Sequence, residues 1–164
     1  MKLKPDLSKT FEWRKYFTNA GALDTDVRSI EKLHAEARSF LEYYDWCEAI
    51  TEEYVGLIYP GIVGVFLFRF VPTRMGVDEW VWVITGDLPP AYITCEDSPN
   101  PATALDAYVG AMLEWVQAAE EGVPTEQLIP VNVEPSKENA IRLKTRLSFL
   151  DEKILSGYEE DLKA

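Results

Sequence analysis

The first regular pattern of apolar residues in this chain begins beside Asp24 and Thr25. From there, apolar side chains recur at alternating steps of three and four residues, at Ile30, Leu33, Ala37, Phe40 and Tyr44. Such steps place side chains on one face of a helix, and Asp and Thr are favoured at the N-cap. The pattern therefore predicts a helix that packs one face against a neighbour.

A second segment continues the same spacing. Its apolar residues are Trp46, Ile50, Tyr54 and Leu57, and the sequence YPG at 59–61 is a stop signal. We expect this segment to be helical, either as a continuation of the first helix or after a bend.

Two segments in the middle of the chain are rich in β-branched and aromatic residues. Residues 62–71 (IVGVFLFRFV) are apolar in both alternating registers apart from Arg69, and residues 80–85 (WVWVIT) have the same character. This composition is typical of strands that are covered on both faces. A third run, residues 91–95, follows the turn sequence GDLPP. Because the connections are short, the three runs predict an antiparallel meander.

Two further helices are predicted in the second half of the chain. Asn100 and Pro101 are a helix-start signal, and Gly122 is a helix-end signal. The apolar positions between them are Leu105, Val109, Met112, Val116 and Ala119. Ser136 caps the last helix, whose apolar positions are Ala140, Leu143, Leu147, Leu150 and Ile154.

The remaining segments are short. We expect residues 129–133 (IPVNV) to form an edge strand, where proline is tolerated, and the chain after Gly157 to be frayed. Together the elements predict an α+β fold, with an antiparallel three- to four-stranded meander packed with about four helices. We expect an N-terminal basic segment at 1–20, a single α+β domain at 21–157 and a tail at 158–164.

Charge restricts the partners that the protein can have. The 164 residues carry a net charge of −12, and residues 21–136 hold twenty acidic and five basic groups. Such a surface repels phosphate backbones and anionic lipids, so we expect neither nucleic acid nor a membrane as a partner.

The longest uncharged run, residues 54–68, is also too short to span a bilayer. Two cysteines without a disulfide framework, and a start that lacks the apolar core of a signal peptide, predict a cytoplasmic protein.

No motif with a known catalytic mechanism is present. The sequence has no glycine-rich dinucleotide loop, phosphate loop, HExxH, GxSxG or CxxC pair. We therefore predict no catalytic residue, metal ligand or cofactor, and we favour a protein that is not an enzyme. His34 is an ordinary residue at the edge of a helix face, a general base or a partner of Cys95. Because Glu96 and Asp97 follow Cys95 and disfavour its thiolate, we expect an inert thiol.

Two charged groups have more than one interpretation. Asp45, Glu48 and Glu52 would share one face of the second helical segment. They are interpreted as a solvated face, or as a cluster compensated by a metal without histidine, by an Arg or by a basic partner. Arg69, in an apolar strand, must be paired or reach solvent. Its candidate partners are Asp78, Glu79 and Asp87, and an anion site at the sheet end is the alternative.

The last helix carries a basic cluster. Arg142 and Arg146 lie one turn apart, where they could bind a phosphate-bearing ligand or dock on the acidic body of the protein itself.

Four strings together resemble a known group of sequences. They are GIVGVFLFRF, DEWVWVITGDLPPAY, ALDAYVGAMLEWVQ and IPVNV. On these strings the chain resembles an uncharacterised bacterial family of domains of unknown function, over about residues 40 to 155, and GDLPPAY is the most specific piece. That family has no assigned reaction, cofactor or catalytic residue, so the resemblance implies no site.

Two functional hypotheses follow. The first is a non-catalytic protein-binding module, of immunity or regulatory type, for a basic partner, because acidic inhibitors gain association rate by charge steering. Its binding residues would be Asp45, Glu48, Glu52, Glu53, Asp87, Glu96 and Asp97. The alternative is a binding domain or enzyme for an anionic small molecule, with a pocket at the sheet end near Arg69. That pocket would be lined by Trp80, Trp82 and Tyr92. A homodimer is compatible with either.

Overall fold

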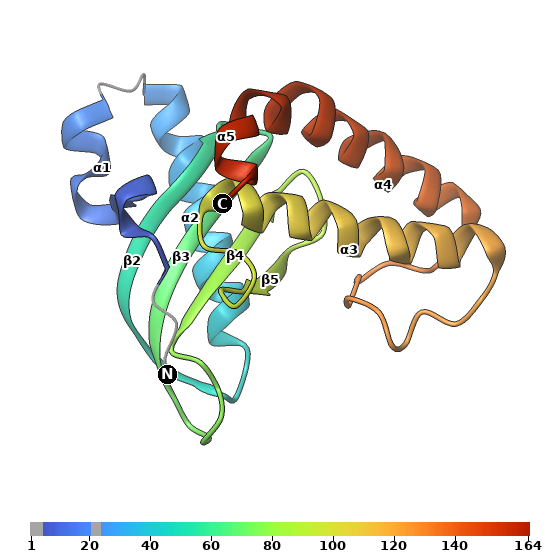
Figure 1. Cartoon of the computed structure of the whole chain (residues 1–164), viewed down its shortest axis with the longest axis horizontal. Coiled ribbons are helices and arrows are strands. Elements are labelled where there is room, and N and C mark those ends of the chain that lie inside the picture. Colours follow the sequence, from blue (N-terminus) through green and yellow to red (C-terminus); the bar gives the residue numbers. More distant parts are fainter. Residues whose placement is uncertain (1–4, 21–23) are drawn as a thin grey trace.

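The centre of the molecule is an antiparallel sheet with its strands in chain order (Figure 1). The computed structural model describes residues 5–20 and 24–164. The strands are β1 (Phe11–Glu12), β2 (Cys47–Tyr59), β3 (Val63–Pro72), β4 (Trp80–Gly86) and β5 (Ala91–Thr94). The predicted α+β class is confirmed, with five strands instead of three or four.

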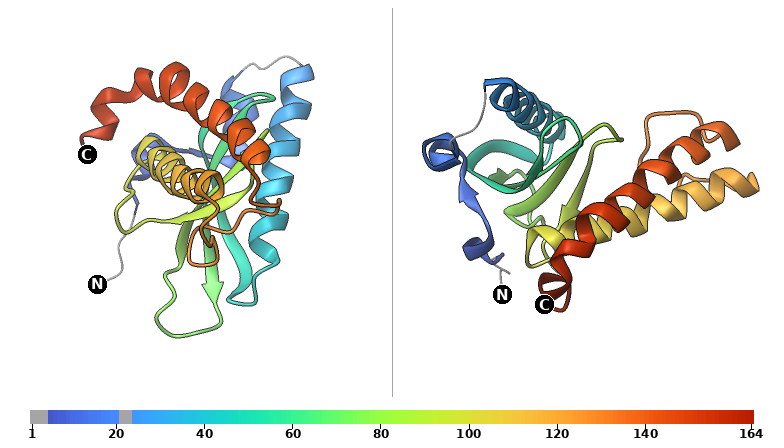
Figure 2. Two further views of the ribbon diagram at one scale, coloured as in Figure 1. Left: turned by 90° about the vertical axis from the view of Figure 1, so that its right-hand side faces the viewer. Right: turned by 90° about the horizontal axis from the view of Figure 1, so that it is seen from above.

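Helices cover both faces of this sheet. They are α1 (Trp13–Ala20), α2 (Asp24–Glu42), α3 (Pro101–Glu121), α4 (Lys137–Phe149) and α5 (Glu159–Leu162), with short helical turns at Leu7–Lys9, Leu150–Ile154 and Leu155–Tyr158. Figure 2 shows α2 on one face and α3 on the other, with α4 beside α3 and both extending past the sheet. No helix among the described residues is both long enough and apolar enough to cross a bilayer.

The helices predicted around residues 30, 105 and 143 are confirmed. α2 begins at Asp24; the residues that precede it, 21–23, lie outside the described residues, as do residues 1–4 of the N-terminal basic segment. At the start of α3, Asn100 accepts a hydrogen bond from the Thr103 amide at 2.9 Å, and the Thr103 hydroxyl accepts one from the Asn100 amide at 3.1 Å. Gly122 ends α3 with a φ of 69°, and Ser136 caps α4. The capping residues in the sequence therefore correctly predicted both ends of α3 and the start of α4.

The predicted second helical segment is wrong: residues 47–59 form β2, the longest strand. Its pairing with β3 is interrupted by three register shifts, each of which adds a residue to one side. The side chains of β2 on the α2 face therefore lie at Cys47, Ile50, Glu53, Val55 and Ile58. Of the four residues that suggested a helix, Trp46 and Ile50 pack on the α2 side and Tyr54 and Leu57 on the α3 side. Their helix-like spacing therefore did not mark one face of the segment.

Strands β3 and β4 are covered on both faces, as their composition predicts. Phe66 and Phe68 pack toward α2, whereas Leu67 and Trp82 pack toward α3, and all four are fully buried. The middle of the sheet is thus a core with no polar surface.

Two short segments differ from the prediction. Residues 129–133 make no strand; Ile129 and Val131 instead pack, partly buried, on the α3 side of the core. The tail is not frayed but docked, because the Tyr158 and Tyr59 hydroxyls lie 2.9 Å apart and the Asp161 carbonyl accepts a hydrogen bond from the Asn100 side chain at 2.9 Å.

Candidate functional site

The antiparallel topology brings four separate segments to one end of the sheet. β2 and β4 begin there and β3 and β5 end there, at the bottom of Figure 1. We call residues 43–48, 71–80 and 94–97 the acidic end, because they carry six carboxylates. These are Asp45, Glu48, Asp78, Glu79, Glu96 and Asp97.

Three of these carboxylates remain available to a partner. Glu48, Glu96 and Asp97 are exposed and form no ion pair within the described part of the chain. Asp45 pairs with Arg74 at 2.7 Å, but both side chains are well exposed, so the pair contributes little to stability. Four of the seven predicted partner-binding residues thus share one end of the sheet.

Exposed apolar side chains lie at the same end. Met75, at the tip of the β3–β4 loop, is fully exposed, and Val71 is 41% exposed. Tyr43 is 86% exposed but lines a different hollow, with Phe40 of α2 and with Leu88 and Pro90 of the β4–β5 turn. Apolar groups among charges are typical of protein interfaces.

Glu52 has a structural role next to the acidic end. It lies opposite Arg69 in the β2–β3 pairing, and the Arg69 Nη1 donates to its Oε2 at 2.7 Å. Arg69 also lies 3.4 Å from Glu79 and 5.4 Å from the centre of the Trp80 ring. The hydrogen bond with Glu52 raises the pKa of Arg69. Glu79 was among the partners suggested by the sequence; Glu52 was missed because its strand was taken for a helix.

Glu53 points to the opposite face of β2, where it is bonded to two side chains of α2. Its Oε1 accepts a hydrogen bond from Arg38 at 2.6 Å and lies 3.0 Å from His34 Nε2. The interaction with His34 lowers the pKa of Glu53. The His34 ring stacks on Trp13 with centroids 3.7 Å apart. Glu53 is therefore a structural group.

The proposed pairing of His34 with Cys95 is wrong, because the two residues lie on opposite faces of the sheet. Cys95 belongs to the core under α3, while His34 contacts Phe66 and Phe68 under α2. Burial, with a smaller contribution from Asp78, raises the pKa of the Cys95 thiol to about 12 and so disfavours the thiolate. The cause is therefore burial rather than the Glu96 and Asp97 charges that the sequence suggested.

A hollow of about 320 Å³ opens at the acidic end. Aromatic rings form much of its wall: Trp46 lies 5.3 Å from Phe70 and 5.3 Å from Tyr92 between ring centroids. The complete lining is Trp46, Phe70, Gly76, Val77, Asp78, Trp80, Val81, Tyr92, Thr94 and Glu96.

The four residues of the predicted anionic-ligand pocket are not all brought together. Trp80 and Tyr92 line this hollow. Trp82 is fully buried, with its indole Nε1 donating to the Ser98 carbonyl at 2.8 Å, and Arg69 is held by carboxylates. Trp46 and Phe70 were missed as lining residues. The β-branched residues at 50, 51, 55 and 58 were a signal for the strand that places Trp46 there.

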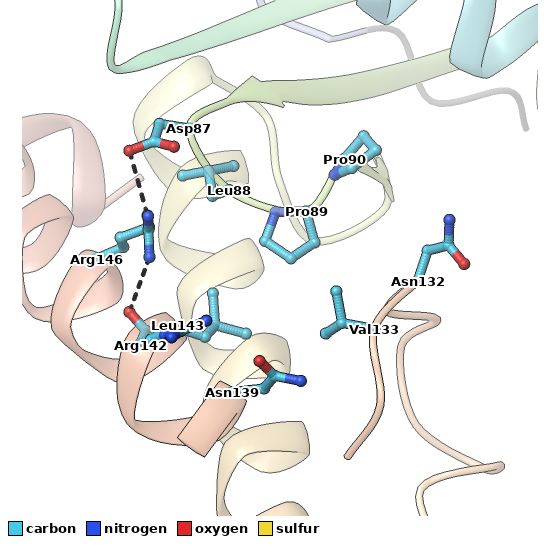
Figure 3. Close-up of a pocket in the computed structure, with 10 residues that line it drawn as sticks. All are labelled: Asp87, Leu88, Pro89, Pro90, Asn132, Val133, Asn139, Arg142, Leu143 and Arg146. Atoms are coloured by element: carbon cyan, nitrogen blue, oxygen red, sulfur yellow. Dashed lines mark hydrogen bonds and ion pairs between the residues drawn. The ribbon is translucent and has the colours of Figure 1, made fainter. Parts of the chain in front are cut away.

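Asp87 lies apart, at the opposite end of the sheet. Figure 3 shows Arg146 reaching from α4 to this carboxylate, and the Arg146 Nε donates to the Asp87 Oδ2 at 3.2 Å. The neighbouring Arg142 pairs with Glu138 at 2.7 Å. A hollow of about 420 Å³ lies between the β4–β5 turn and α4. Of the two interpretations of the basic cluster, docking on the protein's own acidic groups thus accounts for Arg146.

Among residues 5–20 and 24–164, no three His, Cys, Asp or Glu side chains are grouped to hold a metal ion. No protein-family model, no curated protein and no solved structure matches this chain. The functional proposal therefore depends on the geometry of the acidic end.

Proposed function

We propose that the protein is a cytoplasmic, non-catalytic binding module, of immunity or regulatory type, that docks a basic protein on its acidic end. One observation carries the proposal: exposed carboxylates from different segments lie at one end of the sheet, where Val71 and Met75 are also exposed. Exposed apolar side chains beside charged groups give a partner both buried area and a preferred orientation.

The charges favour a basic partner in particular. The carboxylates of Glu48, Glu96 and Asp97 have no cation of this chain to neutralise them within the described residues. A basic surface that meets them gains association rate by electrostatic steering, and salt screens that gain.

The state of the reactive side chains supports a role without catalysis. The Cys95 thiol is protonated at neutral pH by burial, and His34 is stacked on Trp13 and bonded to Glu53. The anionic-ligand alternative has less support, because the guanidinium of Arg69 is already shared by Glu52 and Glu79.

Affinity capture with matched variants tests the proposal. One variant carries Glu48→Lys, Glu96→Lys and Asp97→Lys; the control carries Asp106→Lys, Glu114→Lys and Glu126→Lys, which are exposed positions elsewhere. Both variants change the net charge equally. In extracts of the organism that encodes the chain, we expect the wild type and the control to capture one stoichiometric basic protein, and the first variant to lose it.

Two results would contradict the proposal. One is the absence of any stoichiometric partner at low and at moderate salt. The other is equal capture by both variants, since it would show that the acidic end is not where the partner docks.

A further inference from the structure

We propose that the hollow at the acidic end receives the guanidinium group of an arginine side chain from the basic partner. This inference rests on the proposed function and specifies the chemistry by which the partner is recognised. It follows from the shape of the hollow, its aromatic wall and the sign of the charges that line it.

The aromatic wall suits a cation with a flat face. Trp46 and Tyr92 meet edge to face, with planes at 70°, and Tyr44 stacks behind Trp46 at 4.9 Å. These contacts fix the rings in place before a ligand arrives. Ring faces attract cations, and a guanidinium both carries charge and stacks on rings.

The charges of the hollow have one sign. Asp78 and Glu96 line it, and none of its ten lining residues is basic. The Asp78 Oδ1 atom is buried and has no hydrogen-bond partner among the described residues, so no donor at that atom offsets the negative charge of Asp78 beside the hollow. A guanidinium offers five N–H donors, whereas an ammonium offers three. Because a guanidinium can stack on the aromatic wall while its several donors face the carboxylates, arginine is favoured over lysine.

The molecule contains the same recognition pattern internally. Arg69 lies over the Trp80 ring at 5.4 Å and is held by Glu52 and Glu79. The hollow has aromatic rings and two carboxylates in a comparable combination but has no cation from its own lining. Its volume of about 320 Å³ accommodates one side chain rather than a folded element.

An NMR titration of the full chain tests the inference with small probes. N-acetyl-arginine amide is compared with N-acetyl-citrulline amide, which has nearly the same shape but no charge, and with N-acetyl-lysine amide. We expect saturable shifts of the Trp46 indole and Tyr92 signals by the arginine probe, with a dissociation constant on the order of a millimolar. The citrulline probe should bind at least about tenfold more weakly, because it lacks the cation–π and ionic contributions.

Three variants locate the effect. Asp78→Asn and Glu96→Gln should each weaken binding of the arginine probe, whereas Glu48→Gln removes the same charge at the same end without touching the hollow and should not. Equal binding of citrulline, lysine binding as tight as arginine, no saturable shift, or equal effects of all three variants would each overturn the assignment. The citrulline comparison needs no variant, so it stands even if a substitution disturbs folding.

The two proposals can fail separately. Arginine-probe binding in a protein that captures no basic partner would remove the proposed function and leave a cation site. Capture of a partner at the acidic end without probe binding would remove only the arginine site.

Discussion

The two ends of the sheet use their charges differently. At the β4–β5 turn, Asp87 is neutralised by Arg146, and the Tyr108 hydroxyl donates to the Pro89 carbonyl at 2.5 Å, which holds the turn against α3. At the acidic end, Glu48, Glu96 and Asp97 project into solvent with no ion pair in the described chain. At one end the polar groups are bonded to other parts of the fold; at the other end several are left available for association.

This difference also divides neighbouring residues near the acidic end. Glu52 and Glu53 are adjacent on β2, point to opposite faces and are each held by a cation, while Glu48 on the same strand is not. Carboxylates with a structural role should therefore be separable from available ones by substitution.

The largest effect is expected at Glu53. Glu53→Gln removes charged hydrogen bonds with His34 and Arg38 from a side chain that is only 17% exposed, and we expect a loss of about 2 kcal/mol in the free energy of unfolding in urea at pH 7. Glu48→Gln, the control on the same strand, should stay within about 0.5 kcal/mol.

The same variant has a defined pH dependence. Because folding lowers the pKa of Glu53 from its ordinary value of 4.5, its stabilisation is complete above that pH and is lost as the pH falls through the lower value. The gap between wild type and Glu53→Gln should therefore close in acid. A gap that is constant from neutral to acidic pH would show that the ionised carboxylate is not the stabilising group.

The next effect is expected at the opposite end of the sheet. Tyr108 is fully buried, and Tyr108→Phe leaves the Pro89 carbonyl without its donor, at a cost of about 1 kcal/mol in thermal or urea unfolding. Probe binding in the distant aromatic hollow should be unchanged. A variant as stable as the wild type would mean that water replaces the lost donor.

A smaller effect separates two arginines near the acidic end. Arg69→Met leaves Glu52 and Glu79 facing each other, whereas Arg74→Met removes a pair whose side chains are 61% and 77% exposed. We expect the urea midpoint to fall for Arg69→Met and to stay unchanged for Arg74→Met. Equal midpoints for the two variants would contradict a structural role of Arg69.

The smallest effect is a gain. In the double variant Glu96→Gln, Asp97→Asn, neighbouring like charges are removed, so stability should rise by at most about 0.5 kcal/mol at low salt, with no difference at high salt. Asp87→Asn should show no gain in stability, since this substitution removes the ion pair with Arg146. A stability loss in the double variant would show that these carboxylates have unrecognised structural partners.

Much of the fold could be predicted because its helices carry both a period and end signals. In α3, the spacing of Leu105, Val109 and Met112 agrees with the caps at Asn100 and Gly122. β2 could not be predicted in this way, because its register shifts are set by pairing with β3, which sequence spacing does not show.

The candidate site was predictable only in part. Sequence alone suggested that Asp45, Glu48, Glu96 and Asp97 are available charges, but only the topology brings residues about fifty positions apart to one end. Asp87 is separated from them, and Glu53 is held by residues of α2. The exposed Tyr43 and Met75 could not be distinguished from core residues before the fold was known.

The three irregularities in β2 also bear on self-association. β1 pairs with β2 at Phe11 and Glu12, so within residues 5–20 and 24–164 much of the long outer margin of β2 has no neighbouring strand. A straight margin of this kind would be a template for stacking against other copies of the chain. Bulges disrupt the regular spacing of donors and acceptors along a strand, so the irregular margin of β2 is a poorer template for such stacking.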